Sequence, residues 1–313
     1  MRKLAAVFGI GVTLVLIGVA GSAYFLAQRA DYGWRPRIAQ PTFTREHPRV
    51  LVDEGHHNAS SIGFAGRYWP FGRLLRADGY LVERFAQPMT PTVLAGARVL
   101  VIANASGAPK PQLFGLNLPN FTSKKRSDAA FTSAEIGVIR GWVEQGGALL
   151  LIADHAPFGQ SVSALASALG ITMHQGFVEV PGERSDPLMF SDANGRLGQH
   201  PIIAGDGASL AVSRVMTYTG QSLDGPPNAT VLLRLPDTAR EAVPTNSDEL
   251  AERAAGSAQG LAFSLGKGRV VCLGEGGMVT AQVNRSEHYG ISDARNDNQQ
   301  FVLNVMRWLV GKL

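Results

Sequence analysis

Residues 135–154, EIGVIRGWVEQGGALLLIAD, decide the fold. A capping box, residues 132–135 (TSAE), begins a helix because its two ends reciprocally satisfy free backbone amides. Along that helix, apolar side chains recur on one face at Ile136, Ile139, Trp142 and Val143. Two glycines end the helix, and the apolar run 148–153 follows at once, as in a buried strand. A helix joined directly to a buried strand indicates an α/β domain.

The same pattern extends in both directions from this stretch. We predict further strands at residues 50–52, 80–85, 98–104, 214–218 and 229–235. We predict helices at residues 61–77, where Pro70 should kink the helix or split it in two, and at 161–169 and 297–309. Residues 266–268 (GKG) supply the turn of an antiparallel hairpin between strands 259–265 and 269–273. The predicted fold is a three-layer α/β domain with a mostly parallel, mixed sheet.

Three apolar runs end in polar clusters, after residues 52, 153 and 273. If these strands are parallel neighbours, the clusters meet at the carboxyl ends of the strands, where open α/β sheets bind ligands. We therefore expect one pocket there, whose candidate catalytic residues are Asp53, His56, Asp154, His155 and Glu275.

Three chemistries fit this candidate pocket. Carboxylates with separated pKa values beside a histidine suit metal-free acid–base hydrolysis. His56, His155 and Asp154 are alternatively candidate ligands for a divalent metal, and no other cofactor is indicated. Without catalysis, the pocket would hold a small polar ligand, such as a carbohydrate or cell-envelope fragment. The ligand-binding candidates are His57, Asn58, Asn104, Tyr68 and Trp69, the last two as stacking faces.

Structural roles compete with these functional ones. Asp53 and Asp154 are suited to capping the helices that follow them, and one of the neighbours His56 and His57 is expected to be a satisfied buried group. Asp297 is expected at the N-cap of the last helix.

The N-terminus indicates a membrane segment. Arg2 and Lys3 precede 24 uncharged residues, 4–27, and a membrane helix needs about 20 apolar residues. We predict an anchor or signal at residues 1–27, a proline-containing linker at 28–48 and one domain at 49–313. The two basic residues favour a cytoplasmic N-terminus, with the domain outside the cytoplasm.

Composition excludes several classes of protein. The chain has 313 residues, 45% of them hydrophobic, which is enough for a full core. Its net charge is +4, but the basic residues are dispersed, so nucleic acid is not an expected partner. The single cysteine, Cys272, rules out an internal disulfide and any cysteine-rich zinc module.

Residues 49–313 resemble the class I glutamine amidotransferase-like superfamily, whose fold is flavodoxin-like. The resemblance is carried by residues 135–154, by 266–271 (GKGRVV) and by the ending from 297 to 309 (DNQQFVLNVMRWL). These phrases are similar to those of a poorly characterised membrane-associated bacterial branch that includes components of membrane complexes. For this branch, a protein partner in a membrane complex is the third expectation, which a large apolar patch at the insertion 108–130 would favour.

Glutaminase activity is not expected from this resemblance. Amidotransferases carry a nucleophilic cysteine on the turn after a central strand, whereas the matching turn here, residues 154–159 (DHAPFG), has none. Cys272 lies within a predicted strand, and thiolate chemistry requires an exposed, activated sulfur.

Overall fold

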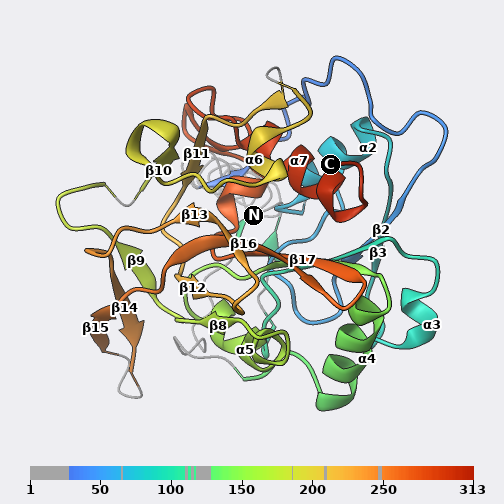
Figure 1. Cartoon of the computed structure of the whole chain (residues 1–313), viewed down its shortest axis with the longest axis horizontal. Helices are drawn as coiled ribbons and strands as arrows, with labels where there is room; N and C mark the ends of the chain where they lie inside the picture. The colour runs from blue at the N-terminus through green and yellow to red at the C-terminus, as the bar shows by residue number, and fades with distance from the viewer. Residues whose placement is uncertain are drawn as a thin grey trace, which may run out of the picture.

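The computed structural model describes residues 28–64, 66–109, 112–113, 116–117, 128–184, 186–207, 210–245 and 249–313. Within them, a nine-stranded sheet forms the centre of the molecule (Figure 1). Its strands are β2 (Arg49–Asp53), β3 (Leu81–Phe85), β4 (Val99–Ala103), β7 (Ala148–Ile152), β8 (Thr172–Met173), β12 (Leu223–Asp224), β13 (Thr230–Arg234), β16 (Ala258–Leu265) and β17 (Gly268–Leu273). Their order is β3-β2-β4-β7-β17-β16-β12-β8, and β13 pairs with β16.

The first half of this sheet is parallel. β3, β2, β4, β7 and β17 pair in parallel, each with the next. β16 then turns back antiparallel to β17, with Leu265 opposite Gly268, and the sheet continues through antiparallel pairs. The prediction of a mixed sheet with a parallel centre and the GKG hairpin is therefore confirmed.

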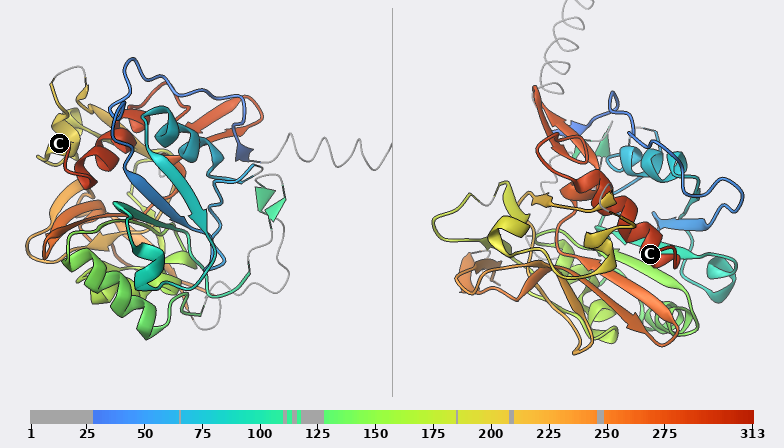
Figure 2. Two further views of the ribbon diagram at one scale, coloured as in Figure 1. Left: turned by 90° about the vertical axis from the view of Figure 1, so that its right-hand side faces the viewer. Right: turned by 45° about the horizontal axis from the view of Figure 1, so that its top comes forward.

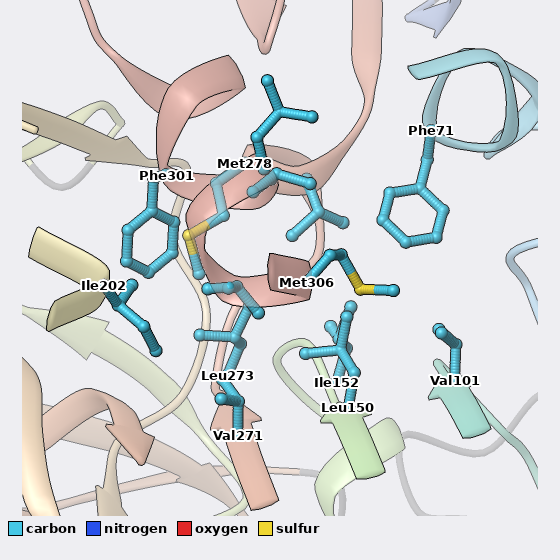
Figure 3. Close-up of a cluster of buried hydrophobic side chains, with 14 of the residues drawn as sticks. Phe71, Val101, Leu150, Ile152, Ile202, Val271, Leu273, Met278, Phe301 and Met306 are labelled. Carbon is cyan, nitrogen blue, oxygen red and sulfur yellow. The ribbon is translucent and has the colours of Figure 1, made fainter. Parts of the chain in front are cut away.

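Helices cover both faces of the sheet, so the domain has three layers. They are α2 (Trp69–Ala77), α3 (Pro91–Leu94), α4 (Ser133–Glu144), α5 (Phe158–Ala168), α6 (Pro201–Ala204) and α7 (Asn298–Leu309). On one face, Leu150 and Ile152 pack with side chains of α2 and α7 (Figure 3). On the other, Leu149 and Leu151 pack with α4 and α5. This alternation explains the unbroken apolar run of β7: a strand covered on both faces has no side facing water.

The helix predicted at residues 61–77 begins only at Trp69. The preceding residues form turns instead, because Ile62 donates its backbone amide to the Glu54 carboxylate and Tyr68 donates to the carbonyl of Ser61. Pro70 therefore lies in the first turn of α2 and does not kink it, since a proline there removes no helical hydrogen bond. The predicted helix was too long at its start because the apolar spacing did not reveal these local bonds.

The other predicted helices are confirmed with small shifts. The capping box of α4 forms between Thr132 and Glu135 in both directions. The helix predicted at 161–169 is α5, which begins three residues earlier. Asp297 occupies the N-cap position of α7, but its carboxylate instead accepts the backbone amides of Ser213 and Arg214.

Smaller sheets surround the centre (Figure 2). Their strands are β1 (Arg29–Ala30) with β18 (Ala281–Asn284) and β19 (Glu287–Gly290); β10 (Leu188–Ser191) with β11 (Arg214–Thr217); β9 (Phe177–Glu179) with β14 (Arg240–Pro244) and β15 (Leu250–Ala254); and β5 (Gln112–Leu113) with β6 (Leu116–Asn117). The β14–β15 pair projects from the body at the lower left of Figure 1.

The predicted linker, residues 28–48, packs against the domain. Its first residues form β1, and the backbone amides of Thr42 and Phe43 donate to Asp78. A free linker would make none of these bonds. The predicted membrane segment, residues 1–27, lies outside the described residues, as does most of the insertion 108–130. Among the helices that are described, none has the length and apolar character needed to cross a bilayer.

Candidate functional site

The parallel strands bring four polar residues to one edge of the sheet. Asp53 ends β2, Asn104 follows β4, Asp154 lies two residues beyond β7 and Glu275 lies two residues beyond β17. Since β2, β4, β7 and β17 are successive neighbours, these residues form a row across the strand ends. We call this row, with the side chains that contact it, the rim.

At the β2 end of the rim, an imidazole lies between two carboxylates. Nδ1 of His56 is 2.9 Å from each carboxylate oxygen of Asp53, and Nε2 is 3.0 Å from Oε1 of Glu135. All three side chains are buried, and Phe131 packs on the imidazole with ring centroids 4.1 Å apart. Both ring nitrogens are thus engaged, which matches the expectation that one of His56 and His57 is a satisfied buried group.

Electrostatics favours the charged form of this imidazole. Burial lowers the pKa of His56, but the hydrogen bonds and charges of Asp53 and Glu135 outweigh burial and raise it overall. Burial opposes ionisation of Glu135, yet its bonds from Thr132, Met89 and His56 lower its pKa to about 2. The three groups therefore form a buried ionic network whose role is to hold the loop after β2.

Glu135 was not among the predicted site residues. In the sequence, Glu135 appeared only as the last residue of the capping box. In the structure, the cap uses only one of the two carboxylate oxygens of Glu135. Oε2 accepts from Thr132, and Oε1 accepts from the backbone amide of Met89 and contacts His56. No pattern along the chain could indicate this second use, because His56 is 79 residues away.

A second group surrounds Gly276. The hydroxyl of Tyr68 donates to the carbonyl of Gly276 at 2.8 Å, and Oδ1 of Asn104 accepts the backbone amide of Asp154 at 2.9 Å. A β-carbon added at Gly276 would lie 2.5 Å from the Tyr68 hydroxyl, 2.9 Å from Nδ2 of Asn104 and 3.3 Å from Oδ2 of Asp154. Three polar atoms from separate segments thus converge on one glycine.

Glu275 lies beneath this group and is 1% exposed. Its carboxylate accepts the backbone amide of Met278 at 2.7 Å and also that of Gly277. Burial first, and then the negative charge of Asp154, raise the pKa of Glu275 well above its ordinary value, against the effect of these amides. Asp154 itself is partly exposed, so the pair combines a buried carboxyl group, that of Glu275, with a solvent-accessible one.

Arg67 is a rim residue that the sequence did not indicate. Its guanidinium lies within electrostatic reach of Asp154 and Glu275, and Nη2 donates to Oε1 of Gln282 at 2.7 Å. Burial lowers its pKa, and the two carboxylates partly offset that effect. It follows a glycine in a turn-rich loop and belongs to no motif.

The other ligand-binding candidates are dispersed. Asn58 donates to Asp53 and to the carbonyl of Ala103, so it supports the β2 end, whereas His57 is exposed. Tyr68 is buried and offers the rim only its hydroxyl. Trp69 packs on Tyr32, with ring centroids 5.4 Å apart, at the start of α2. The burial of Tyr68 leaves it no stacking face at the rim, whereas a stacking role for the half-buried Trp69 stays a prediction.

His155 lies at the outer side of the rim. Its ring stacks on Phe177 at 4.6 Å, and Nδ1 is 2.8 Å from the carbonyl of Ala156. Among the described residues, no group of three or more His, Cys, Asp or Glu side chains has an arrangement that could hold a metal ion. The candidate metal set of His56, His155 and Asp154 is not assembled, because the ring of His56 is already held by two other carboxylates.

The Cys272 side chain is not part of the rim, although the residue is the last but one of β17. It is fully buried and packs on the face of the sheet covered by α4 and α5. Burial raises the pKa of its thiol, which opposes thiolate formation. A hollow of about 800 Å³ exists elsewhere, between the segment 31–37 and residues 288–300, and none of the predicted site residues lines it.

Comparison with known proteins gives a fold only. No protein family matches the chain, and no curated protein does. The mmIFT52 N-terminal domain is similar in structure with a TM-score of 0.54 and 14% identity, over 83% of this chain and 97% of that domain. A GMP synthase-like protein from Thermoplasma acidophilum has a TM-score of 0.43 and 11% identity, over 84% and 94% of the two chains. A ThuA-like protein from Bacteroides uniformis has a TM-score of 0.45 and 14% identity, over 88% and 96%. Of these three scores, only the first is high enough to establish a shared fold.

Proposed function

We propose that this chain is an amidotransferase-like protein that has no glutaminase activity and binds a small polar ligand at the rim. The observation that carries the proposal is the convergence of Tyr68, Asn104 and Asp154 on Gly276, with Arg67 beside them. The proposal keeps residues 1–27 as a membrane anchor, with the domain outside the cytoplasm.

The chemistry of these groups defines the class of ligand. An amide, a carboxylate and a guanidinium together supply donors and acceptors in several directions, as a hydroxylated molecule requires. A sugar of the cell envelope has this chemistry. The buried thiol of Cys272 supports the exclusion of glutaminase chemistry, since it would have to leave the sheet interior to reach a substrate.

Ligand binding is tested by saturation-transfer NMR on the full chain in detergent, with N-acetylglucosamine as the probe. D154N should weaken binding about tenfold, the effect of losing one charged hydrogen bond of roughly 1.5 kcal/mol. D237N removes a carboxylate from an exposed turn and is the matched control, with no change expected. Absence of transfer to the wild-type chain would contradict the proposed ligand class.

Glutaminase activity is tested separately by ammonia release from L-glutamine. Neither the wild-type chain nor C272A should release ammonia above the background rate. Release that disappears in C272A would contradict this part of the proposal.

An acid–base hydrolase is the second candidate, favoured by the contrast between Glu275 and Asp154. A protonated, buried Glu275 would act as the acid and the accessible Asp154 as the base. Hydrolysis of 4-nitrophenyl N-acetyl-β-glucosaminide or 4-nitrophenyl acetate, abolished by E275Q and D154N, would favour this candidate. Equal rates in wild type and both variants would exclude it for these substrates.

A further inference from the structure

An aromatic and basic surface lies beside the point where the chain enters the described part of the protein. It consists of Tyr32, Phe64, Trp69, Arg35 and Arg73, and we call it the N-terminal face. Phe64 is 85% exposed, more than any other large hydrophobic side chain in the described ranges. An exposed phenylalanine beside other aromatic rings is a feature of contact surfaces.

The members of this face contact one another. The ring centroid of Tyr32 is 6.2 Å from that of Phe64 and 5.4 Å from that of Trp69. The guanidinium of Arg73 lies 4.4 Å from the centre of the Trp69 ring. Nη1 of Arg73 donates to the carbonyl of Trp34 at 3.0 Å, the residue before Arg35, so two cationic residues belong to this face. The like charge of Arg35 contributes, after burial, to a lowered pKa of Arg73. The face therefore combines one exposed and two half-buried aromatic rings with two arginine side chains.

The face adjoins the start of the described chain. Tyr32 lies two residues after β1, and 27 residues, 24 of them in an uncharged run, precede Gln28. In both views of Figure 2, β1, the β18–β19 hairpin and α2 lie at the same end of the molecule. A membrane segment in residues 1–27 would bring this end close to the bilayer.

The rim lies near the same end. Nε2 of Gln28 donates to Oε1 of Gln282 at 3.0 Å, and Arg67 donates to the same oxygen at 2.7 Å. One glutamine side chain thus connects the start of the described chain to the guanidinium beside Asp154 and Glu275.

We propose that the N-terminal face contacts the headgroup layer of an anionic bilayer, with Phe64 inserted among the lipids. Tryptophan and tyrosine favour the membrane interface, and arginine side chains near an anionic surface are attracted to it. The inference rests on the proposed membrane anchor and is independent of the proposed ligand. It places the rim near the membrane surface, so that the ligand is taken from the layer just above the lipids.

The test uses the full chain in vesicles of phosphatidylethanolamine and phosphatidylglycerol. An NBD fluorophore is attached through F64C or, as the matched control, through L250C on β15. Leu250 is also exposed, at 54%, and β15 lies on the opposite side of the molecule from α2 in Figure 1. The native Cys272 is fully buried and should remain unlabelled.

Brominated lipids should quench the fluorophore at position 64 several-fold more than at position 250. Replacing the anionic lipid with phosphatidylcholine should reduce the quenching at position 64.

Equal quenching at both positions in a chain that sediments with vesicles would overturn the proposed membrane contact of the N-terminal face but not the proposed membrane anchor. A chain that does not sediment with vesicles would overturn both. A blue shift at position 64 without lipid quenching would show that protein covers the face and would also overturn the inference. None of these outcomes depends on N-acetylglucosamine binding.

Discussion

At the residue scale, His56 shows how a predicted catalytic group can have a structural role. A histidine that serves as a general base needs a ring nitrogen free to take a proton. In this protein, one nitrogen faces Asp53 and the other faces Glu135, and the ring is covered by Phe131. The charged imidazole compensates two buried carboxylates, which would otherwise be costly to bury.

Replacing His56 should therefore destabilise the fold in a pH-dependent way. H56Q leaves the two carboxylates without their cation, and we expect a loss of about 3–5 kcal/mol in the free energy of unfolding. The raised pKa of His56 means that its contribution is complete below 6.5 and declines as the pH rises through the raised value. The pKa of Glu135, lowered from 4.5 to about 2, means that its contribution declines as the pH falls from 4.5 towards 2.

The difference between wild type and H56Q should accordingly be largest between pH 4.5 and 6.5, measured by urea unfolding across this range. H57Q, which changes the exposed neighbouring histidine, is the control and should change little. A pH-independent difference would contradict the charged network.

Gly276 provides a second test at this scale. G276A would place a methyl group against the Tyr68 hydroxyl and the Asn104 amide, so we expect about 1–3 kcal/mol of destabilisation from overpacking. G137A, in α4, adds a methyl group with no atom within 4 Å and should stabilise by roughly 1 kcal/mol through helix propensity. Thermal unfolding of both variants measures the contrast. Equal changes in the two melting temperatures would show that the rim is not packed as described.

At the element scale, one aspartate joins three parts of the chain. Asp78 lies at the end of α2, forms a buried ion pair with Arg307 of α7 and accepts the backbone amide of Thr42. Its carbonyl also accepts the amide of Phe43. One carboxylate between two helices thus holds the segment around Thr42, in addition to the pairing of β1 with β18 and the bonds between Arg37 and Gln299.

D78N should destabilise the protein by about 3–5 kcal/mol, because it leaves the Arg307 guanidinium buried without its counter-ion. R140A removes an exposed ion pair with Glu144 on α4 and should cost only about 0.3–0.5 kcal/mol. Urea unfolding gives both values. Limited proteolysis should also cleave D78N faster within residues 38–45, where the wild-type chain is held by Asp78. A D78N chain as stable as R140A would show that this ion pair does not hold the elements together.

At the scale of the whole molecule, the reactivity of the Cys272 thiol measures whether the central sheet is folded. It pairs with Leu261 on one side and Leu151 on the other, at the centre of the sheet, and is covered by a helical layer. No local opening at the surface would expose its thiol. Alkylation of the thiol by iodoacetamide should therefore require global unfolding. The logarithm of the alkylation rate should increase with urea concentration, with the same m-value as equilibrium unfolding. Rapid alkylation in the absence of urea would contradict this burial.

The local sequence was enough to predict the parallel centre of the fold. Buried strands such as residues 148–152 are apolar throughout, capping residues mark the start of α4, and the GKG turn closes a hairpin. These signals act over a few residues, so they can be read from a single chain. The order in which β2, β7 and β17 end in polar residues likewise located the rim, because parallel neighbours must end at one edge.

The tertiary structure decided which polar residues belong together and what each one does. Glu135 and Arg67 reach the rim from segments that carry no site motif, whereas Trp69 lies against Tyr32. A side chain's partners depend on contacts between segments that are 50 or more residues apart, such as Asn104 with Asp154 and Tyr68 with Gly276. Charge, burial and pKa follow from those contacts, so residue type alone could not separate the buried ionic network of His56 from the partly accessible group around Asp154.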